Sequence, residues 1–148
     1  MSTKATNMGF SKLNLLRIGI ALIYLWFGAL KFFGEMSPAS KLATTTMTKL
    51  SFHMVDEKWS LLLLGIVETL LGTFLLTNVR LRWVIRIASL HLAGTFSPLL
   101  LLPDTCFVEV PFGLTLEGHY IIKNIVLLLG FWIIFPSKEA HAHSDSVS

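Results

Sequence analysis

The chain has 148 residues, of which 53% are hydrophobic and 14% are charged, and its mean hydropathy is +0.69. This composition is far from that of an ordinary soluble domain and is typical of a compact polytopic membrane protein. The formal charge of +3 does not indicate nucleic-acid binding, because the basic residues flank apolar segments instead of forming a patch with interleaved aromatic residues. The single cysteine, Cys106, excludes an internal disulfide and a CxxC redox pair, so any redox chemistry needs a partner or a diffusible cofactor.

Four apolar segments are long enough to cross a bilayer as helices. They cover residues 13–33, 59–77, 83–102 and 116–135. The first predicts a retained membrane helix, because its apolar stretch is longer than that of a signal peptide and no convincing cleavage site follows it. Residues 1–12 are a polar lead, and we expect residues 136–148 to be a disordered polar tail. The fold class predicted is all-α, an integral membrane four-helix bundle in one domain.

Residues within and between the four apolar segments predict a short helix, a kink, a turn and a helix cap. Ser37 and Pro38 are a suitable N-cap and first-turn proline for a short helix through Lys41 to Leu50, which would lie along the outer surface. Pro98 predicts a kink in the third segment. The loop after the third segment is acidic and extended and includes a turn, and Thr115 is the predicted N-cap of the fourth helix.

The distribution of basic residues predicts the orientation. Cytoplasmic loops of membrane proteins are enriched in lysine and arginine. Seven basic residues fall on the side shared by both termini and the connection between the second and third helices, against three in the opposite loops: Lys4, Lys12, Arg17, Arg80, Arg82, Arg86 and Lys138 against Lys41, Lys49 and Lys58. Both termini are therefore expected in the cytoplasm, and the two longer loops outside.

The second segment contains one carboxylate, Glu68, almost at its middle. A lone charged carboxylate at the bilayer centre costs about 2.5–3.5 kcal/mol, so Glu68 must be protonated, paired or facing a wet cavity. Gly65, Glu68 and Gly72 share one helix face, and small residues on a membrane helix let another helix approach closely. We therefore expect Glu68 to point into the bundle.

Further polar residues are expected at a depth in the membrane similar to that of Glu68. At the helical rise, Glu68 lies about 13 Å below the outer surface and Lys123 about 10 Å, whereas Lys31 lies only a few Å inside. His91 is near the middle of the third helix, and Asn124 adjoins Lys123. One buried cluster of Glu68, His91, Lys123 and Asn124 is predicted.

The cluster has two interpretations. In the structural one, Glu68 and Lys123 form an internal ion pair that fixes helix register. In the functional one, Glu68 and His91 are candidate catalytic residues that handle protons or bind a quinol head group, since a carboxylate and an imidazole at depth suit that chemistry. No metal-binding signature is present in the sequence.

Lys31 shares a face of the first helix with Tyr24, Gly28 and Arg17. For Arg17 we expect the long stem to reach toward the membrane interface. The candidate binding residues are Lys31, Lys123, Asn124 and Tyr24, and the two lysines, near the outer side, would attract an anion.

Three stretches carry a resemblance to a known family: RIGIALIYLWFGALKFF, LLGIVETLLGTFLL and TLEGHYIIKNIVLLLG. In order and spacing they resemble the DoxX-like superfamily of small four-helix bacterial inner-membrane proteins, including its branch linked to reactive-chlorine resistance. The similarity covers roughly residues 13–135. The resemblance matches the family's lysine at the end of the first helix to Lys31 and its glutamate in the second helix to Glu68. It matches the family's lysine and neighbouring polar residue in the fourth helix to Lys123 and Asn124.

The resemblance implies a multi-pass inner-membrane protein that serves as an accessory or quinone-facing subunit of a redox or oxidative-stress system, similar to the small subunit of thiosulfate:quinone oxidoreductase. No cofactor motif is evident in the chain, which argues against a self-sufficient oxidoreductase and leaves a diffusible quinone as the expected cofactor. The expected partners are the lipid bilayer and either a membrane or redox protein or a second copy of the chain. A small-molecule or ion transporter and a non-catalytic membrane scaffold are the alternatives.

Overall fold

The computed structural model describes residues 4–33 and 40–136, and side chains from Lys12 onward. The described chain is mostly helical. Its elements are α1 (Lys4–Lys31), α2 (Ser40–Leu50), α3 (Glu57–Thr77), α4 (Leu81–Gly94), α5 (Pro98–Leu101), α6 (Pro103–Cys106), β1 (Phe107–Glu109), β2 (Gly113–Leu114) and α7 (Leu116–Ile134). The predicted cap at Ser37 and Pro38, and the tail beyond Pro136, lie outside the described residues.

Four helical spans are long and apolar enough to cross a membrane, and they agree with the four predicted segments. They are Lys12–Lys31, Glu57–Thr77, Leu81–Leu101 and Leu116–Ile134. Most of each span faces outward, and large apolar side chains such as Trp26, Leu90 and Trp132 are more than two-thirds exposed. Hydrophobic residues on all sides of a helix are typical of surroundings that are themselves apolar.

The first helix begins earlier than predicted. α1 starts at Lys4, whereas residues 1–12 were expected to be a lead outside the helix. Residues 4–12 contain no proline, and adding residues to an existing helix is far easier than nucleating one. The helix therefore continues beyond the apolar span that begins at Lys12.

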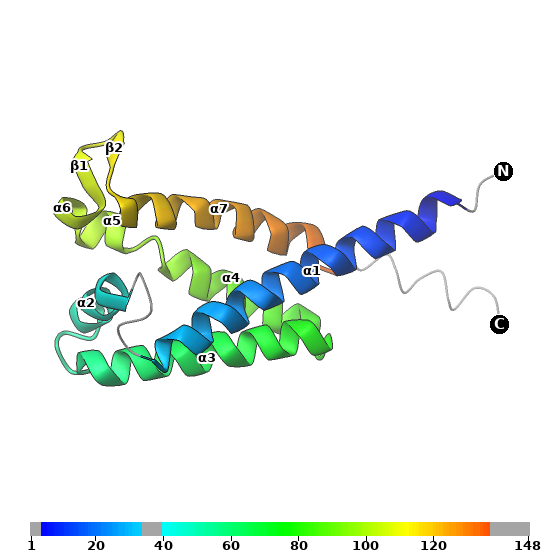
Figure 1. The fold of residues 1–148 in the computed structure, drawn as a ribbon, viewed down its shortest axis with the longest axis horizontal. Helices are drawn as coiled ribbons and strands as arrows, with labels where there is room; N and C mark the ends of the chain where they lie inside the picture. The colour runs from blue at the N-terminus through cyan, green and yellow to red at the C-terminus, as the bar shows by residue number, and fades with distance from the viewer. Residues whose placement is uncertain (1–3, 34–39, 137–148) are drawn as a thin grey trace.

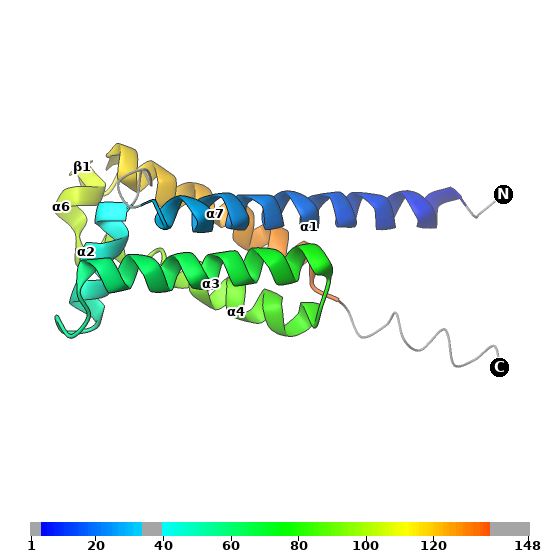
Figure 2. The same ribbon diagram turned by 60° about the horizontal axis from the view of Figure 1, so that its bottom comes forward.

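The four long helices run side by side along the longest axis of the molecule (Figures 1 and 2). α1 packs against α3 and α7, and α4 packs against the same two helices, which gives a closed ring in the order α1, α3, α4, α7. The short elements α2, α5 and α6 and the β1–β2 hairpin gather at the end of the bundle where α1 ends and α3 begins.

Glycines let α1 and α3 approach closely. A Cβ on Gly28 would lie 2.8 Å from the backbone nitrogen of Thr69, and one on Gly72 would lie 2.8 Å from that of Leu25. Either contact is too short for a real side chain, so the two backbones can be this near only because both positions are glycine. The predicted glycine face of α3 is therefore the face that contacts α1.

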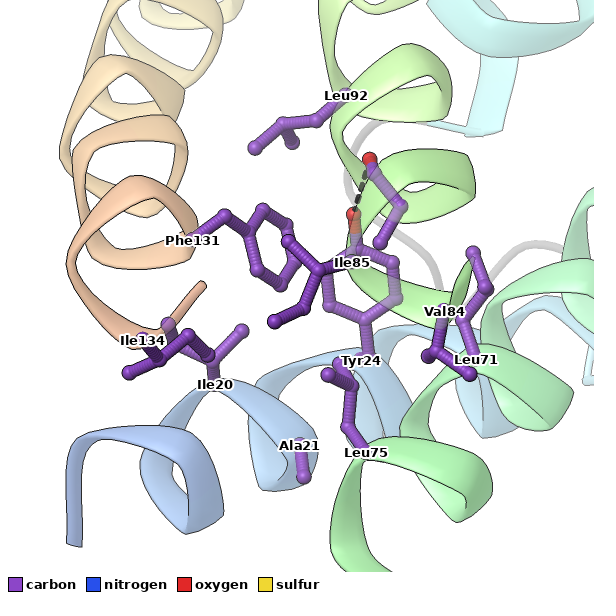
Figure 3. Close-up of a cluster of buried hydrophobic side chains, with 11 residues drawn as sticks. Ile20, Ala21, Tyr24, Leu71, Leu75, Val84, Ile85, Leu92, Phe131 and Ile134 are labelled. Carbon is purple, nitrogen blue, oxygen red and sulfur yellow. Dashed lines mark hydrogen bonds between the residues drawn. The ribbon is translucent and has the colours of Figure 1, made fainter. Parts of the chain in front are cut away.

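The buried apolar side chains form two separate clusters. The larger joins all four long helices and consists of Ile20, Ala21, Tyr24, Leu71, Leu75, Val84, Ile85, Ala88, Leu92, Phe131 and Ile134, most of which are labelled in Figure 3. The smaller lies toward the loop end and consists of Leu42, Cys106 and Ile121, with Phe96, Leu99, Leu102 and Phe107 packed against it.

The third span is interrupted, as Pro98 predicts. α4 ends at Gly94 and α5 begins at Pro98, and the residues between them form turns in which Phe96 N–H donates to Ala93 and Ser97 N–H donates to Gly94. Because proline cannot donate a backbone hydrogen bond, the regular α-helical pattern cannot continue through this position.

At the loop end, α2 and the acidic loop differ from the prediction, whereas the cap of α7 agrees with it. α2 packs against α3 and α5 and buries Leu42, Thr44 and Thr46, so it is an integral part of the fold and does not simply lie along the surface. The acidic loop contains an antiparallel hairpin, β1–β2. Thr115 caps α7 as predicted, its hydroxyl accepting a hydrogen bond of 3.2 Å from the Gly118 N–H.

Candidate functional site: a polar layer between two apolar clusters

Lys31 and Glu68 form an ion pair inside the bundle. The Nζ of Lys31 lies 2.5 Å from Oε2 of Glu68, and the two side chains are only 8% and 12% exposed. The close approach of α1 to α3 makes this contact possible, since the position of a Cβ on Gly65 is 3.2 Å from the Lys31 Cβ. With no side chain at Gly65, the lysine stem can run along the surface of α3 toward the carboxylate.

The predicted partner of Glu68 was Lys123, and that pairing is wrong. Lys123 is exposed on α7, where its Nζ lies 5.6 Å from the centre of the Tyr120 ring. The depth estimate placed Lys31 too close to the surface, and it gave no information on which helix α3 contacts most closely. The glycine contacts bring α1, and so Lys31, to Glu68.

His91 lies on the other side of the Glu68 carboxylate. Its Nε2 is 3.8 Å from Oε1 of Glu68, and its ring centre is 6.0 Å from that of Tyr24. The second ring nitrogen, Nδ1, is buried and has no hydrogen-bond partner among the described residues. Buried polar atoms are nearly always hydrogen-bonded, so Nδ1 lacks a partner that such an atom normally has.

Tyr24 forms the boundary between the polar layer and the larger apolar cluster. It is 4% exposed, and its hydroxyl donates to the carbonyl oxygen of Ala88 at 3.2 Å, the dashed line in Figure 3. Its ring also packs against Phe131, with 5.8 Å between the centres. The hydroxyl is therefore already bonded to α4, which makes Tyr24 a structural member of the site.

Asn124 extends the layer onto α7. Its Nδ2 donates to the Thr95 hydroxyl at 3.0 Å, and that hydroxyl donates in turn to the carbonyl oxygen of Leu92 at 2.6 Å. Thr95 comes directly after the end of α4, where carbonyl groups lose their helical partners. Asn124 thus joins α7 to the interrupted third span, and it forms no hydrogen bond with Glu68.

The polar side chains form a layer across the bundle. Along α1, α3 and α7, the residues Lys31, Glu68 and Asn124 come between the larger cluster and the loop end of the molecule. On α4, His91 lies near the loop-side edge of that cluster, between Ala88 and Leu92. Charges enclosed by apolar packing interact more strongly with one another than charges in water do. The layer brings together an ammonium group, a carboxylate and an imidazole, which are groups that exchange protons and hydrogen-bond to oxygen atoms.

Two contacts were not foreseen from the sequence. Thr69, which follows Glu68, faces Gly28, and its hydroxyl is buried without a partner in the described part of the chain. The Arg17 side chain donates to the carbonyl oxygens of Leu75 and, at 3.0 Å, Leu76 near the end of α3, a pairing that the expectation of a stem reaching toward the interface did not include. A cation near the end of a helix compensates its negative dipole end and its unpaired carbonyl groups.

Other residue types add little to the site. Within residues 12–33 and 40–136, no group of three histidine, cysteine, aspartate or glutamate side chains could hold a metal ion. Cys106 is fully buried, and burial, together with the nearby carboxylate of Glu117, raises the pKa of its thiol. A raised pKa leaves less of the nucleophilic thiolate, so Cys106 is a packing residue of the smaller cluster.

No family model, no curated protein and no solved structure matches the chain.

Proposed function

We propose that the chain is a multi-pass protein of the bacterial inner membrane, a member of the DoxX-like superfamily, and an accessory subunit of a membrane redox or oxidative-stress system. The polar layer is its quinone-facing site, and the redox centre that exchanges electrons with the quinone belongs to a partner protein. Within this site, the Glu68 carboxylate accepts a proton from the quinol, and His91 binds a quinol oxygen.

The four apolar spans support the membrane location, and charge supports the orientation. Arg17, Arg80, Arg82 and Arg86 belong to the end where α3 ends and α4 begins. The opposite end carries fewer basic residues, Lys41, Lys49 and Lys58. By the positive-inside rule, the arginine-rich end faces the cytoplasm, with both termini on that side.

The proposed activity rests on the unsatisfied Nδ1 of His91, whose other ring nitrogen, Nε2, faces Glu68. An ion pair alone would explain Lys31 and Glu68, because buried pairs are retained for register. It leaves the buried imidazole nitrogen without a role. A quinol O–H would donate the missing hydrogen bond to Nδ1. On oxidation of the quinol by the partner's redox centre, Nδ1 would take up that proton and Nε2–H would release one to the Glu68 carboxylate on the other side of the ring.

The test is the quinone content of the protein after purification in mild detergent. We expect near-stoichiometric quinone in the wild-type extract. For His91→Leu we expect about tenfold less, since a hydrogen bond of about 1.4 kcal/mol corresponds to a factor of ten in affinity. The matched control is His119→Leu, because His119 is an exposed histidine on α7 that lies outside the layer.

The alternatives give different results. Absence of quinone from the wild type, combined with substrate flux in liposomes that is lost in Glu68→Gln, would replace this proposal with a transporter. A stoichiometric protein partner with no small molecule would indicate a scaffold. Equal quinone loss in both histidine variants would mean that the layer is not the quinone site.

A further inference from the structure

A second candidate site lies at the other end of the bundle from the hairpin, at the turn between α3 and α4. The turn is tight because two of its residues have left-handed backbones, Asn78 with φ 60° and Arg80 with φ 46°. α4 begins directly afterwards at Leu81. Arg80 and Arg82 are therefore held on either side of the first residue of the helix.

These residues line a shallow hollow of about 410 Å³. Its walls are Arg80, Leu81, Arg82 and Trp83 from the start of α4, and Pro136, which follows α7. The hollow thus joins the beginning of one long helix to the end of another. Small-molecule sites occupy roughly 300–1,000 Å³, so the volume is sufficient for a polar head group.

The hollow is strongly basic. Neither Arg80 nor Arg82 lies within ion-pair distance of a carboxylate in the part of the chain that the structure describes. The Arg86 guanidinium, one turn further along α4, lies 5.1 Å from the Trp83 ring centre and adds a third positive charge. Arginine binds phosphate through two parallel hydrogen bonds, so the arrangement suits a phosphodiester.

The surroundings favour a phosphodiester that carries acyl chains. Trp83 is 62% exposed at the start of an apolar span, where tryptophan is favoured at a membrane surface. Below it on α4, Ile87 and Leu90 are exposed, and at the end of α7 Trp132 and Ile133 are exposed. A lipid with its phosphate in the hollow would therefore have apolar helix surface available for its chains on both walls.

We propose that this hollow binds the phosphodiester head group of an anionic membrane phospholipid. Basic pockets at the cytoplasmic ends of membrane helices suit such head groups. The inference rests on the membrane location proposed above, but not on the quinone site. Bound lipid would link the α3–α4 turn to the end of α7.

The test is native mass spectrometry of the detergent-purified protein with phosphatidylglycerol or phosphatidylcholine added at equal concentration. We expect wild-type protein to retain the anionic lipid at least about fivefold better, because each arginine near a lipid surface contributes about 1 kcal/mol. The preference should disappear in Arg80→Gln/Arg82→Gln and persist in Lys41→Gln/Lys58→Gln. The control pair removes the same charge from exposed lysines at the opposite end.

A third variant, a competition with phosphate and a quinone measurement serve as controls. Arg80→Gly relieves the left-handed backbone, so a partial loss of preference in that variant cannot come from a destabilised turn. Inorganic phosphate should leave the bound lipid in place, and displacement by phosphate alone would identify a soluble anion as the ligand instead. Equal loss of preference in the two double variants, or no preference in the wild type, would overturn the proposal. Quinone content should be unchanged in Arg80→Gln/Arg82→Gln, which separates this site from the polar layer.

Discussion

Removing one member of the Lys31–Glu68 pair should destabilise the protein much more than removing both. Glu68→Gln leaves an ammonium group that is 8% exposed without its carboxylate. Loss of one partner of a buried pair costs about 3–5 kcal/mol, whereas replacing the whole pair is often close to neutral. We therefore expect the free energy of unfolding to fall by about 3–5 kcal/mol in Glu68→Gln and by about 1–2 kcal/mol in Lys31→Met/Glu68→Gln.

The two single variants should differ. In Lys31→Met, the carboxylate still has His91 at 3.8 Å, and the imidazole can share or neutralise its charge. In Glu68→Gln, the Lys31 ammonium has no second acidic neighbour among the described residues. The loss in Lys31→Met should consequently fall at the lower end of the range, about 3 kcal/mol.

The assay is reversible unfolding in mixed detergent, supported by the abundance of each variant in the membrane fraction. Lys123→Met is the control. The sequence predicted Lys123 as the partner of Glu68, whereas in the structure its ammonium group lies over the exposed Tyr120 ring. It should change the free energy of unfolding by no more than about 1 kcal/mol. Additive losses in Lys31→Met/Glu68→Gln, or rescue of Glu68→Gln by Lys123→Met, would refute the pairing.

Further predictions concern the helix contacts and hydrogen bonds of the bundle. Gly72→Ala should destabilise the protein by about 1–3 kcal/mol, since its Cβ would lie 2.8 Å from a backbone nitrogen of α1. Gly19→Ala, whose Cβ meets nothing within 4 Å, should be neutral or gain up to about 1 kcal/mol from helix propensity in the same unfolding assay. Arg17→Gln should lose about 1.5–3 kcal/mol with its hydrogen bonds to the end of α3, whereas exposed Lys12→Gln should be neutral, and melting curves of the two variants would decide this. Asn124→Leu should cost about 0.6–1.7 kcal/mol through loss of its bond to a threonine hydroxyl, and no change in its unfolding curve would mean that this bond is not formed.

The sequence was sufficient for the helices because their signals are local. Each long apolar segment, Pro98 and the Thr115 cap are read from neighbouring residues, and each has its counterpart in the structure. The earlier start of α1 at Lys4 was missed because helix propagation beyond an apolar span leaves no hydrophobic pattern. The hairpin β1–β2 was missed because two such short strands have too few residues for an alternating pattern.

The sequence predicted that Glu68 is buried but not which residue it pairs with. Burial of Glu68 followed from its apolar neighbours and the glycine face of its helix. The choice of partner required knowing which helix lies against that face, and spacing within one helix does not contain that information. Gly28 was the available signal, because a second glycine on α1, one turn before Lys31, allows the backbone contact that the structure shows.

The polar layer joins two continuous helices in close backbone contact to a third helix that is interrupted. Lys31 and Glu68 project from helices whose backbones touch through Gly28, Gly65 and Gly72, so their separation is set by close packing. His91 lies on a helix that ends three residues later at Gly94, before a stretch of short turns. A ligand hydrogen-bonded to Nδ1 of His91 would therefore contact an imidazole near the end of its helix, with the rigidly placed Glu68 carboxylate on the other side of the ring.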